Sequence, residues 1–218
     1  MGKKTLILDL DGVLRNFWGQ LSLVVGNLEK HEIKNPPNKF KISEALEDSG
    51  LEPDAAEYYE SIIMNSMASV KNTTMFTNDI IQPAYLPGIA IRKFARKFSW
   101  TDILWDYLSR SFDVTIATDQ PDACHQDTTL LWMWGHLRGF NEHTRVIYTS
   151  GKHLLSGDVI IEDNSETIAK FLENNPQAQG FCVKWPYNSE SNANIDTCNY
   201  FRGDVPNIIE KLDKLLET

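Results

Sequence analysis

Near its start the chain reads Thr5-Leu6-Ile7-Leu8-Asp9-Leu10-Asp11-Gly12-Val13, an apolar run that ends in two aspartates separated by one residue. Residues i and i+2 of an extended strand point to the same side, so Asp9 and Asp11 project together from the end of a strand that is buried on both faces. Two such carboxylates repel each other unless a cation neutralises their charge. Mg²⁺ suits them because it takes oxygen ligands and keeps waters that a phosphate can displace. An alternative stays open here, because Asp-Gly is also a strong signal for the turn of a β-hairpin.

Length, composition and charge narrow the class of protein. The chain has 218 residues, 42% of them apolar, which fits one domain of ordinary size or a core domain with a smaller insert. The net charge of −9 and the pI near 5.0 argue against binding to a nucleic acid polymer or an anionic membrane, since both need basic patches. The first residues, MGKKTLILDLDG, place carboxylates where a signal peptide needs an uninterrupted apolar stretch, so a cytoplasmic location is expected. The cysteines Cys124, Cys182 and Cys198 lack paired spacing and are expected to be free thiols.

Strands and helices alternate along the rest of the chain. After a strand at residues 5–10, a polar stretch at residues 17–85 has helical periodicity and is interpreted as a small helical insert. Further strands are expected at residues 112–117, 145–148, 158–161 and 180–184, and helices at residues 89–98, 102–109, 127–137, 165–172 and 208–216. This alternation is typical of an α/β protein with a parallel sheet and helices on both faces.

Polar residues that follow the expected strands form a candidate site. In an open parallel sheet a ligand binds at the carboxyl ends of the strands, near the point where the strand order reverses. The residues there are Asp9, Asp11, Thr118, Glu162 and Asp163, with Lys152 on the loop before the last two. A hydroxyl, a cation and two acidic pairs around one crevice describe a phosphate site with a metal.

Each of these residue types has a chemical role at such a site. Asp9 can attack phosphorus as a carboxylate nucleophile, while Asp11 can protonate the leaving oxygen and later activate water. Thr118 can donate a hydrogen bond to the phosphoryl group, and Lys152 can neutralise its charge. The pair Glu162-Asp163 can hold Mg²⁺, which stabilises the developing charge.

Taken singly, each residue also has a plainer explanation. Thr118 fits a turn hydroxyl, Lys152 a solvated loop lysine, and Glu162-Asp163-Asn164 the acid-rich start of a helix. Their recurrence at one edge of the sheet favours the site, because solvated charges have no reason to gather there.

The same residues resemble the haloacid dehalogenase superfamily of aspartate-nucleophile phosphatases. The resemblance lies in Asp9-Leu10-Asp11-Gly12, Thr118, Lys152 and Glu162-Asp163. Within that superfamily the chain is similar to the 5'(3')-deoxyribonucleotidases. This narrower likeness rests on the following stretches: Asp9-Leu10-Asp11-Gly12-Val13-Leu14 followed by Phe17, Leu86-Pro87-Gly88, Gly151-Lys152 before Gly157-Asp158, and Trp185-Pro186-Tyr187-Asn188.

The resemblance implies a fold and an activity. The fold is a three-layer Rossmann-like core at residues 1–16 and 86–218, with a small helical cap at residues 17–85. The activity is Mg²⁺-dependent hydrolysis of (deoxy)nucleoside monophosphates to nucleoside and phosphate through an aspartyl-phosphate intermediate. The implied metal ligands are Asp9, Asp11, Glu162 and Asp163, with Asp163 as the direct ligand of the acidic pair and the backbone carbonyl of Asp11 as a further one. The partner is then a small phosphate ester, and a homodimer stays open.

Two positions depart from the nucleotidase pattern. Asp119 follows Thr118 where those enzymes usually have serine, and Glu162 stands where they usually carry aspartate. A carboxylate at the phosphate-binding position is unfavourable unless Asp119 points away or meets a cation.

The pocket for the base or sugar is expected to involve Phe17, Trp18, Gln120 and Tyr187. Two other functions remain open. The same chemistry could act on a sugar phosphate or another small ester, or the protein could be catalytically silent and only bind phosphate or a nucleotide.

Overall fold

A computed structural model describes residues 2–64, 91–189, 198–201 and 205–217 of the chain. Leu86-Pro87-Gly88, which contributes to the resemblance, and the side chain of Cys198 lie outside the described part. The contacts divide the chain into two compact units. The first comprises residues 1–16, 97–119 and 134–218, and the second comprises residues 17–96 and 120–133.

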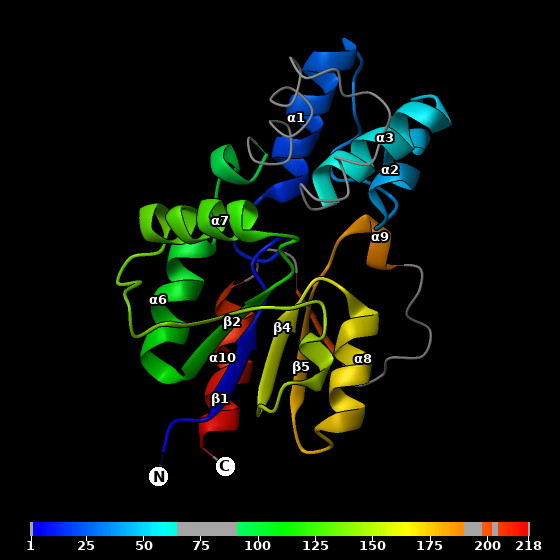
Figure 1. Cartoon of the computed structure of the whole chain (residues 1–218). Helices are drawn as coiled ribbons and strands as arrows, with labels where there is room; N and C mark the ends of the chain where they lie inside the picture. The colour runs from blue at the N-terminus through cyan, green and yellow to red at the C-terminus, as the bar shows by residue number, and fades with distance from the viewer. Residues whose placement is uncertain (1, 65–90, 190–197, 202–204, 218) are drawn as a thin grey trace. The chain divides into compact units, whose positions relative to one another are not determined.

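The first unit is built on a six-stranded sheet with the order β3-β2-β1-β4-β5-β6 (Figure 1). The strands are β1 (Thr5–Leu8), β2 (Asp113–Thr118), β3 (Arg145–Tyr148), β4 (Val159–Glu162), β5 (Gln179–Val183) and β6 (Cys198–Phe201). Every neighbouring pair is parallel. The predicted α/β fold with a parallel sheet is therefore confirmed, although β6 was not predicted.

Strand β1 lies in the middle of the sheet because its apolar residues need neighbours on every side. Leu8 is in register with Ile116 of β2 on one side and with Ile161 of β4 on the other. A strand paired in parallel on both edges leaves no place for a hairpin at Asp11-Gly12, so that alternative is wrong. The strand order reverses at β1, which puts the chain's first carboxylates at the switch point.

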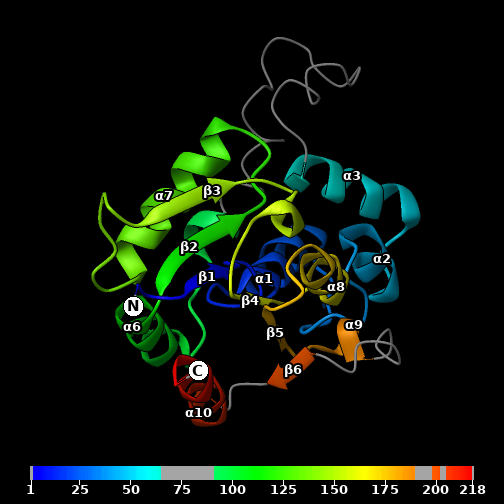
Figure 2. The ribbon, with the colours of Figure 1, turned by 90° about the horizontal axis from the view of Figure 1, so that it is seen from below.

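Helices cover both faces of this sheet (Figure 2). Helix α8 (Ser165–Asn174) packs on β4 and β5, while α6 (Thr101–Ser111) packs beside β2 and contacts α10 (Val205–Leu216). Between α8 and the sheet lies a buried apolar cluster of Ile7, Ala117, Ile160, Ile168, Phe171 and Cys182. This packing holds the carboxyl ends of β1 and β4 at fixed positions next to each other.

The second unit is helical in its described part. It contains α1 (Phe17–Glu29), α2 (Ile42–Asp48), α3 (Pro53–Met64) and most of α7 (Ala123–His136). Inside it the buried Arg92 donates from Nε to Gln120 Oε1 at 2.6 Å and from Nη1 to the Ile63 carbonyl at 3.1 Å. Residues 91–96 and 120–133 belong to this unit, whereas the sequence places them in the core.

Within the described ranges, which omit residues 65–90 and 190–197, the structure contains no helix long and apolar enough to cross a membrane.

Candidate active site

The carboxyl ends of β1 and β4 bring three acidic side chains together. The Asp9 amide donates to the Ile161 carbonyl at 2.9 Å, so the parallel ladder continues one residue past β1 and holds Asp9 beside β4. Glu162 is the last residue of β4 and Asp163 follows it. All three are buried, and each offers a carboxylate oxygen within 4.8 Å of the others. We call Asp9, Glu162 and Asp163 the acidic cluster.

Lys152 joins two members of the acidic cluster. It begins a short 3₁₀ helix, η1 (Lys152–Leu154), and its Nζ lies 2.6 Å from Asp9 Oδ1 and 2.7 Å from Glu162 Oε2. Burial lowers the pKa of Lys152, but the charges of Asp9 and Glu162 and the hydrogen bonds to both outweigh it, and the net pKa is raised. The lysine is therefore held as a cation against the predicted nucleophile.

Both carboxylate oxygens of Glu162 contact donors of the protein. While Oε2 contacts Lys152, Oε1 accepts hydrogen bonds from the amides of Asp163 at 3.3 Å and Asn164 at 3.2 Å. Both oxygens thus have protein donors. Glu162 orients Lys152 and the turn after β4, and Asp9 and Asp163 have more freedom to contact a ligand.

The positive charge of Lys152 compensates only part of the negative charge of the acidic cluster. Three carboxylates and one ammonium leave two negative charges when all four groups are ionised. Burial, and then the charge of Glu162, raise the pKa of Asp9 well above its ordinary value. Burial, and then the charge of Asp9, raise the pKa of Asp163 to about 7. A divalent cation bound at the acidic cluster would balance this negative charge.

Gly12 lets the loop after β1 come close to Asp163. Its φ of 80° lies in the left-handed region, and a Cβ at this position would stand 1.8 Å from Asp163 Oδ2. Its carbonyl accepts a hydrogen bond from Trp185 Nε1 at 2.9 Å. The loop after β1 therefore passes directly over the carboxylate of Asp163, and only glycine allows this approach.

Asp11 is held by an arginine that sequence reasoning missed. Arg15 Nε contacts Asp11 Oδ1 at 2.6 Å, Arg15 Nη2 contacts Asp11 Oδ2 at 2.7 Å, and the arginine side chain is fully buried. The carboxylate of Asp11 is not a member of the acidic cluster. The four-residue spacing of Asp11 and Arg15 was the available signal, but it supports pairing on a helix, and these residues lie in a loop.

Tyr187 and Asn188 fasten Asp163 from the loop after β5. They belong to the short helix α9 (Pro186–Ser189). Tyr187 Oη donates to Asp163 Oδ2 at 2.6 Å, and Asn188 Nδ2 donates to the carbonyls of Asp163 at 2.8 Å and Val183 at 2.7 Å. Tyr187, expected in the substrate pocket, thus contacts a member of the acidic cluster directly.

The phosphate-binding candidates at the end of β2 differ in exposure. Thr118, the last residue of β2, is buried, whereas Asp119 is exposed to solvent. The acidic cluster is itself buried, so Asp119 does not add a fourth carboxylate to it.

The other pocket candidates lie in the second unit. Phe17 and Trp18 are buried there with their rings edge to face at 5.9 Å, and Gln120 accepts the hydrogen bond from Arg92.

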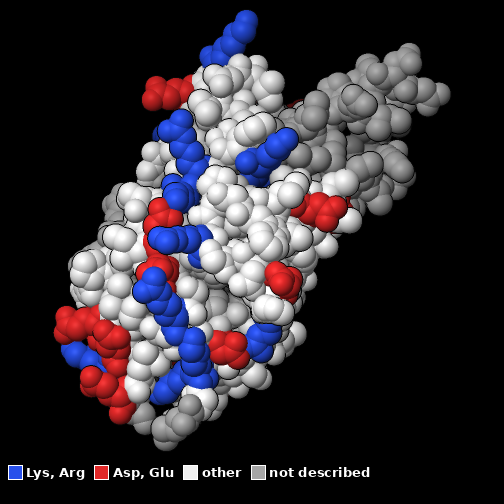
Figure 3. Space-filling view, turned by 90° about the vertical axis from the view of Figure 1, so that its left-hand side faces the viewer, with Lys and Arg blue, Asp and Glu red and all other residues white. Residues whose placement is uncertain are grey.

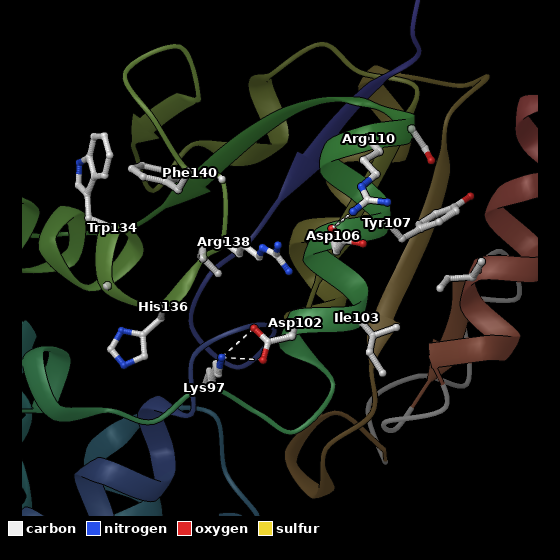
Figure 4. A pocket seen from close by; sticks show the side chains of 15 residues that line it. Lys97, Asp102, Ile103, Asp106, Tyr107, Arg110, Trp134, His136, Arg138 and Phe140 are labelled. Carbon is white, nitrogen blue, oxygen red and sulfur yellow. Dashed lines mark hydrogen bonds and ion pairs between the residues drawn. The ribbon is translucent and has the colours of Figure 1, made fainter.

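A separate hollow of about 880 Å³ lies on the first unit beside α6, the end of α7 and the residues that follow α7 (Figure 4). Its lining includes Lys97 paired with Asp102, and Arg110 paired with Asp106. None of the acidic cluster residues lines it. This hollow is therefore not part of the candidate active site.

No protein-family profile matches the sequence, and no curated protein matches it in sequence either. Solved structures do match over nearly the whole chain. A putative haloacid dehalogenase-like hydrolase from Burkholderia xenovorans is 13% identical with a TM-score of 0.62, and all of both chains is covered. A predicted phosphatase from Clostridium acetobutylicum is 12% identical with a TM-score of 0.55, covering 98% of this chain and all of that one. A putative hydrolase from Bacillus subtilis bound to magnesium is 15% identical with a TM-score of 0.53, and all of both chains is covered. The chain therefore has the fold of haloacid dehalogenase-like hydrolases.

Proposed function

We propose that this protein is a Mg²⁺-dependent phosphatase that hydrolyses (deoxy)nucleoside monophosphates to nucleoside and phosphate in the cytoplasm. The observation that carries the proposal is the pairing of Asp9 with Lys152 inside a buried acidic cluster at the switch point of the sheet. A buried carboxylate that is held against a cation has the surroundings of a nucleophile for phosphoryl transfer. The magnesium-bound and phosphatase neighbours with this fold support the same reaction class.

The proposed reaction has two steps, and Asp9 and Asp11 take part in both. An Asp9 oxygen attacks phosphorus, the bond from phosphorus to the ester oxygen breaks, and Asp11 gives that oxygen a proton. Water then attacks phosphorus of the aspartyl-phosphate, Asp11 takes a proton from the water, and Asp9 is released with inorganic phosphate. Asp11 must leave at least one of its contacts with Arg15 to transfer these protons.

Other residues of the site hold the phosphoryl group. Lys152 offers positive charge beside Asp9, and the Thr118 hydroxyl at the adjacent strand end is the proposed donor to a phosphoryl oxygen. Asp119 has a solvent-exposed side chain, and we place it at the rim of the phosphate position.

The acidic cluster fits a magnesium ion. Asp9, Asp163 and the backbone carbonyl of Asp11 would hold it, with Glu162 supporting Asp163 and Lys152. Two uncompensated negative charges within one buried cluster support this assignment. When bound, the ion supplies positive charge that stabilises the transferring phosphoryl group.

The nucleotide preference rests on the sequence resemblance, above all on Trp185-Pro186-Tyr187-Asn188. In this proposal residues 17–85 are a cap, and Phe17, Trp18, Gln120 and Tyr187 contact the base or sugar. A sugar phosphate or another small ester would be handled by the same strand-end residues.

The test is phosphate release from a panel of 5'- and 3'-(deoxy)nucleoside monophosphates and sugar phosphates, with and without Mg²⁺. We expect release from a mononucleotide that falls by roughly 10³-fold or more in Asp9→Asn, because the nucleophile is lost. Asp113→Asn is the matched control, since Asp113 is an exposed aspartate at the opposite end of β2. Release from sugar phosphates alone would change the substrate class, and a folded protein inactive on every ester would point to a protein that only binds phosphate.

A further inference from the structure

We propose that Tyr187 makes the site select Mg²⁺ over Ca²⁺, because its hydrogen bond to Oδ2 of Asp163 restricts that carboxylate to one-oxygen coordination. This inference rests on the proposed function, since it requires a metal at the acidic cluster. It assigns to Tyr187 a role in metal specificity, separate from any contact with the substrate.

The hydrogen bond is short and well supported. Tyr187 Oη lies 2.6 Å from Asp163 Oδ2, and the tyrosine ring stacks on Trp185 with centroids 6.5 Å apart and planes 25° apart. Trp185 is in turn fixed by its bond to the Gly12 carbonyl and by the ring of Phe98 at 5.3 Å.

The same oxygen is crowded from a second side. The Cα of Gly12 is so close that a Cβ there would lie 1.8 Å from Oδ2. Oδ2 of Asp163 is thus enclosed by the Gly12 backbone and the Tyr187 hydroxyl. Because Tyr187 donates to Oδ2, Oδ1 is the oxygen of Asp163 that would contact a cation in this proposal.

This arrangement discriminates between the two hard divalent cations. Ca²⁺ takes about six to eight oxygens at roughly 2.3–2.6 Å and readily binds both oxygens of one carboxylate. Mg²⁺ needs about six ligands in near-octahedral geometry at roughly 2.0–2.1 Å, keeps several waters, and is satisfied by one oxygen from each carboxylate. A carboxylate with one oxygen already engaged therefore disfavours Ca²⁺ more than Mg²⁺.

The test is calorimetric titration of the full chain with Mg²⁺ and with Ca²⁺ in the absence of substrate, comparing wild type with Tyr187→Phe. The substitution keeps the ring that stacks on Trp185 and removes only the hydroxyl. We expect the preference for Mg²⁺, taken as Kd for Ca²⁺ divided by Kd for Mg²⁺, to fall by roughly tenfold, the order expected for losing a hydrogen bond to a charged group.

A matched control exists in the same unit. Tyr107 Oη donates to Asp213 Oδ1 at 2.6 Å, and neither residue belongs to the acidic cluster. Tyr107→Phe removes a tyrosine–aspartate hydrogen bond of equal length and is expected to leave the ratio unchanged. If Tyr187→Phe does not fold, a second pair of variants decides the question. Tyr187→Gln keeps a hydrogen-bond donor, whereas Tyr187→Met has none. We expect the glutamine variant to retain more of the Mg²⁺ preference than the methionine variant.

The outcomes separate this inference from the proposed function. An unchanged ratio in Tyr187→Phe with Mg²⁺ binding retained overturns the selectivity role, and so does an equal loss of affinity for both ions, which is what a merely structural residue would produce. A wild-type protein that binds neither ion overturns the metal site itself, whatever Tyr187 does.

Discussion

Asp11 and Arg15 differ in how deeply they are buried, and this difference has a measurable consequence. The arginine side chain is fully buried, whereas 24% of the aspartate side chain is exposed. The loop between them is closed by the Gly12 amide, which donates to the Arg15 carbonyl at 3.0 Å. A charge left in the interior without its partner is destabilising, while a charge near the surface is relieved by water.

We therefore expect the two halves of this pair to respond unequally to substitution. Asp11→Asn removes a carboxylate charge that pairs with the buried guanidinium and should lower the free energy of unfolding by about 3 kcal/mol. Arg15→Met leaves a carboxylate that water can reach and should be less destabilising. Urea denaturation of both variants and of the double variant Asp11→Asn/Arg15→Met measures this. Equal effects of the two single changes would contradict the expectation, and the double variant should be more stable than Asp11→Asn alone.

Asp163 predicts a pH dependence of stability in the metal-free protein. Burial, and then the charge of Asp9, raise its pKa from 3.8 to about 7. Between these values the native state holds a proton that the unfolded chain has lost. Because the native state binds more protons, the free energy of unfolding falls as the pH rises through this window, by up to about 1.4 kcal/mol per pH unit.

Urea denaturation in EDTA at about pH 5 and about pH 7.5 tests this pH dependence. The wild type should lose more stability between the two pH values than Asp163→Asn, in which the titrating carboxyl is absent. An identical loss in both proteins would show that other groups govern the pH dependence.

At the scale of elements, the start of α8 couples the helix to the acidic cluster. Asn164 follows Asp163 and has non-helical φ and ψ of −96° and 105°. Its Oδ1 accepts hydrogen bonds from the amides of Glu166 at 2.9 Å and Thr167 at 3.3 Å, so it is the N-cap of α8. The acidic pair therefore lies between the end of a strand and a capped helix, two rigid elements that position it.

Asn164→Ala should remove this cap and lower the free energy of unfolding by about 1 kcal/mol. Asn164→Ser is the control, because serine caps nearly as well as asparagine and should leave stability close to that of wild type. Urea denaturation midpoints of the three proteins give the comparison, and an alanine variant as stable as the serine variant would mean that the cap contributes nothing.

For the molecule as a whole, the net charge is negative, although positive and negative side chains lie among one another on part of the surface. The chain carries a net charge of −9, yet on the face shown in Figure 3 Lys and Arg side chains are interspersed with Asp and Glu. The buried acidic cluster is where we propose that a cation binds.

We expect Mg²⁺ to stabilise the native chain, because the unfolded chain has no assembled site. At about 100 times Kd the ion should raise the free energy of unfolding by about 2.7 kcal/mol. Thermal denaturation over a Mg²⁺ series, with NaCl at matched ionic strength as the control, measures this increase. Asp163→Asn should abolish the increase, and a full increase in that variant would place the ion elsewhere.

Local signals in the sequence were sufficient for much of the fold. The buried strands β1, β2 and β4 are rich in apolar residues, and β3 was predicted at the residues where it lies. The edge strand β6 was missed because Cys198-Asn199-Tyr200-Phe201 has neither a long apolar run nor an apolar–polar alternation. The four-residue helix α9 was missed because so short a segment shows no helical period.

Apolar runs and strand ends are local features, so the amino-acid sequence was enough to predict the parallel α/β class and the side chains that follow the strands. Other contacts appear only in the folded chain: Lys152 links Asp9 and Glu162, Arg15 holds Asp11, Tyr187 donates to Asp163, and Trp185 donates to the Gly12 carbonyl. Trp185 and Gly12 are 173 positions apart in the chain. Contacts over such distances depend on how the sheet orders its strands and on which side chains then share a buried space, and no local pattern encodes either.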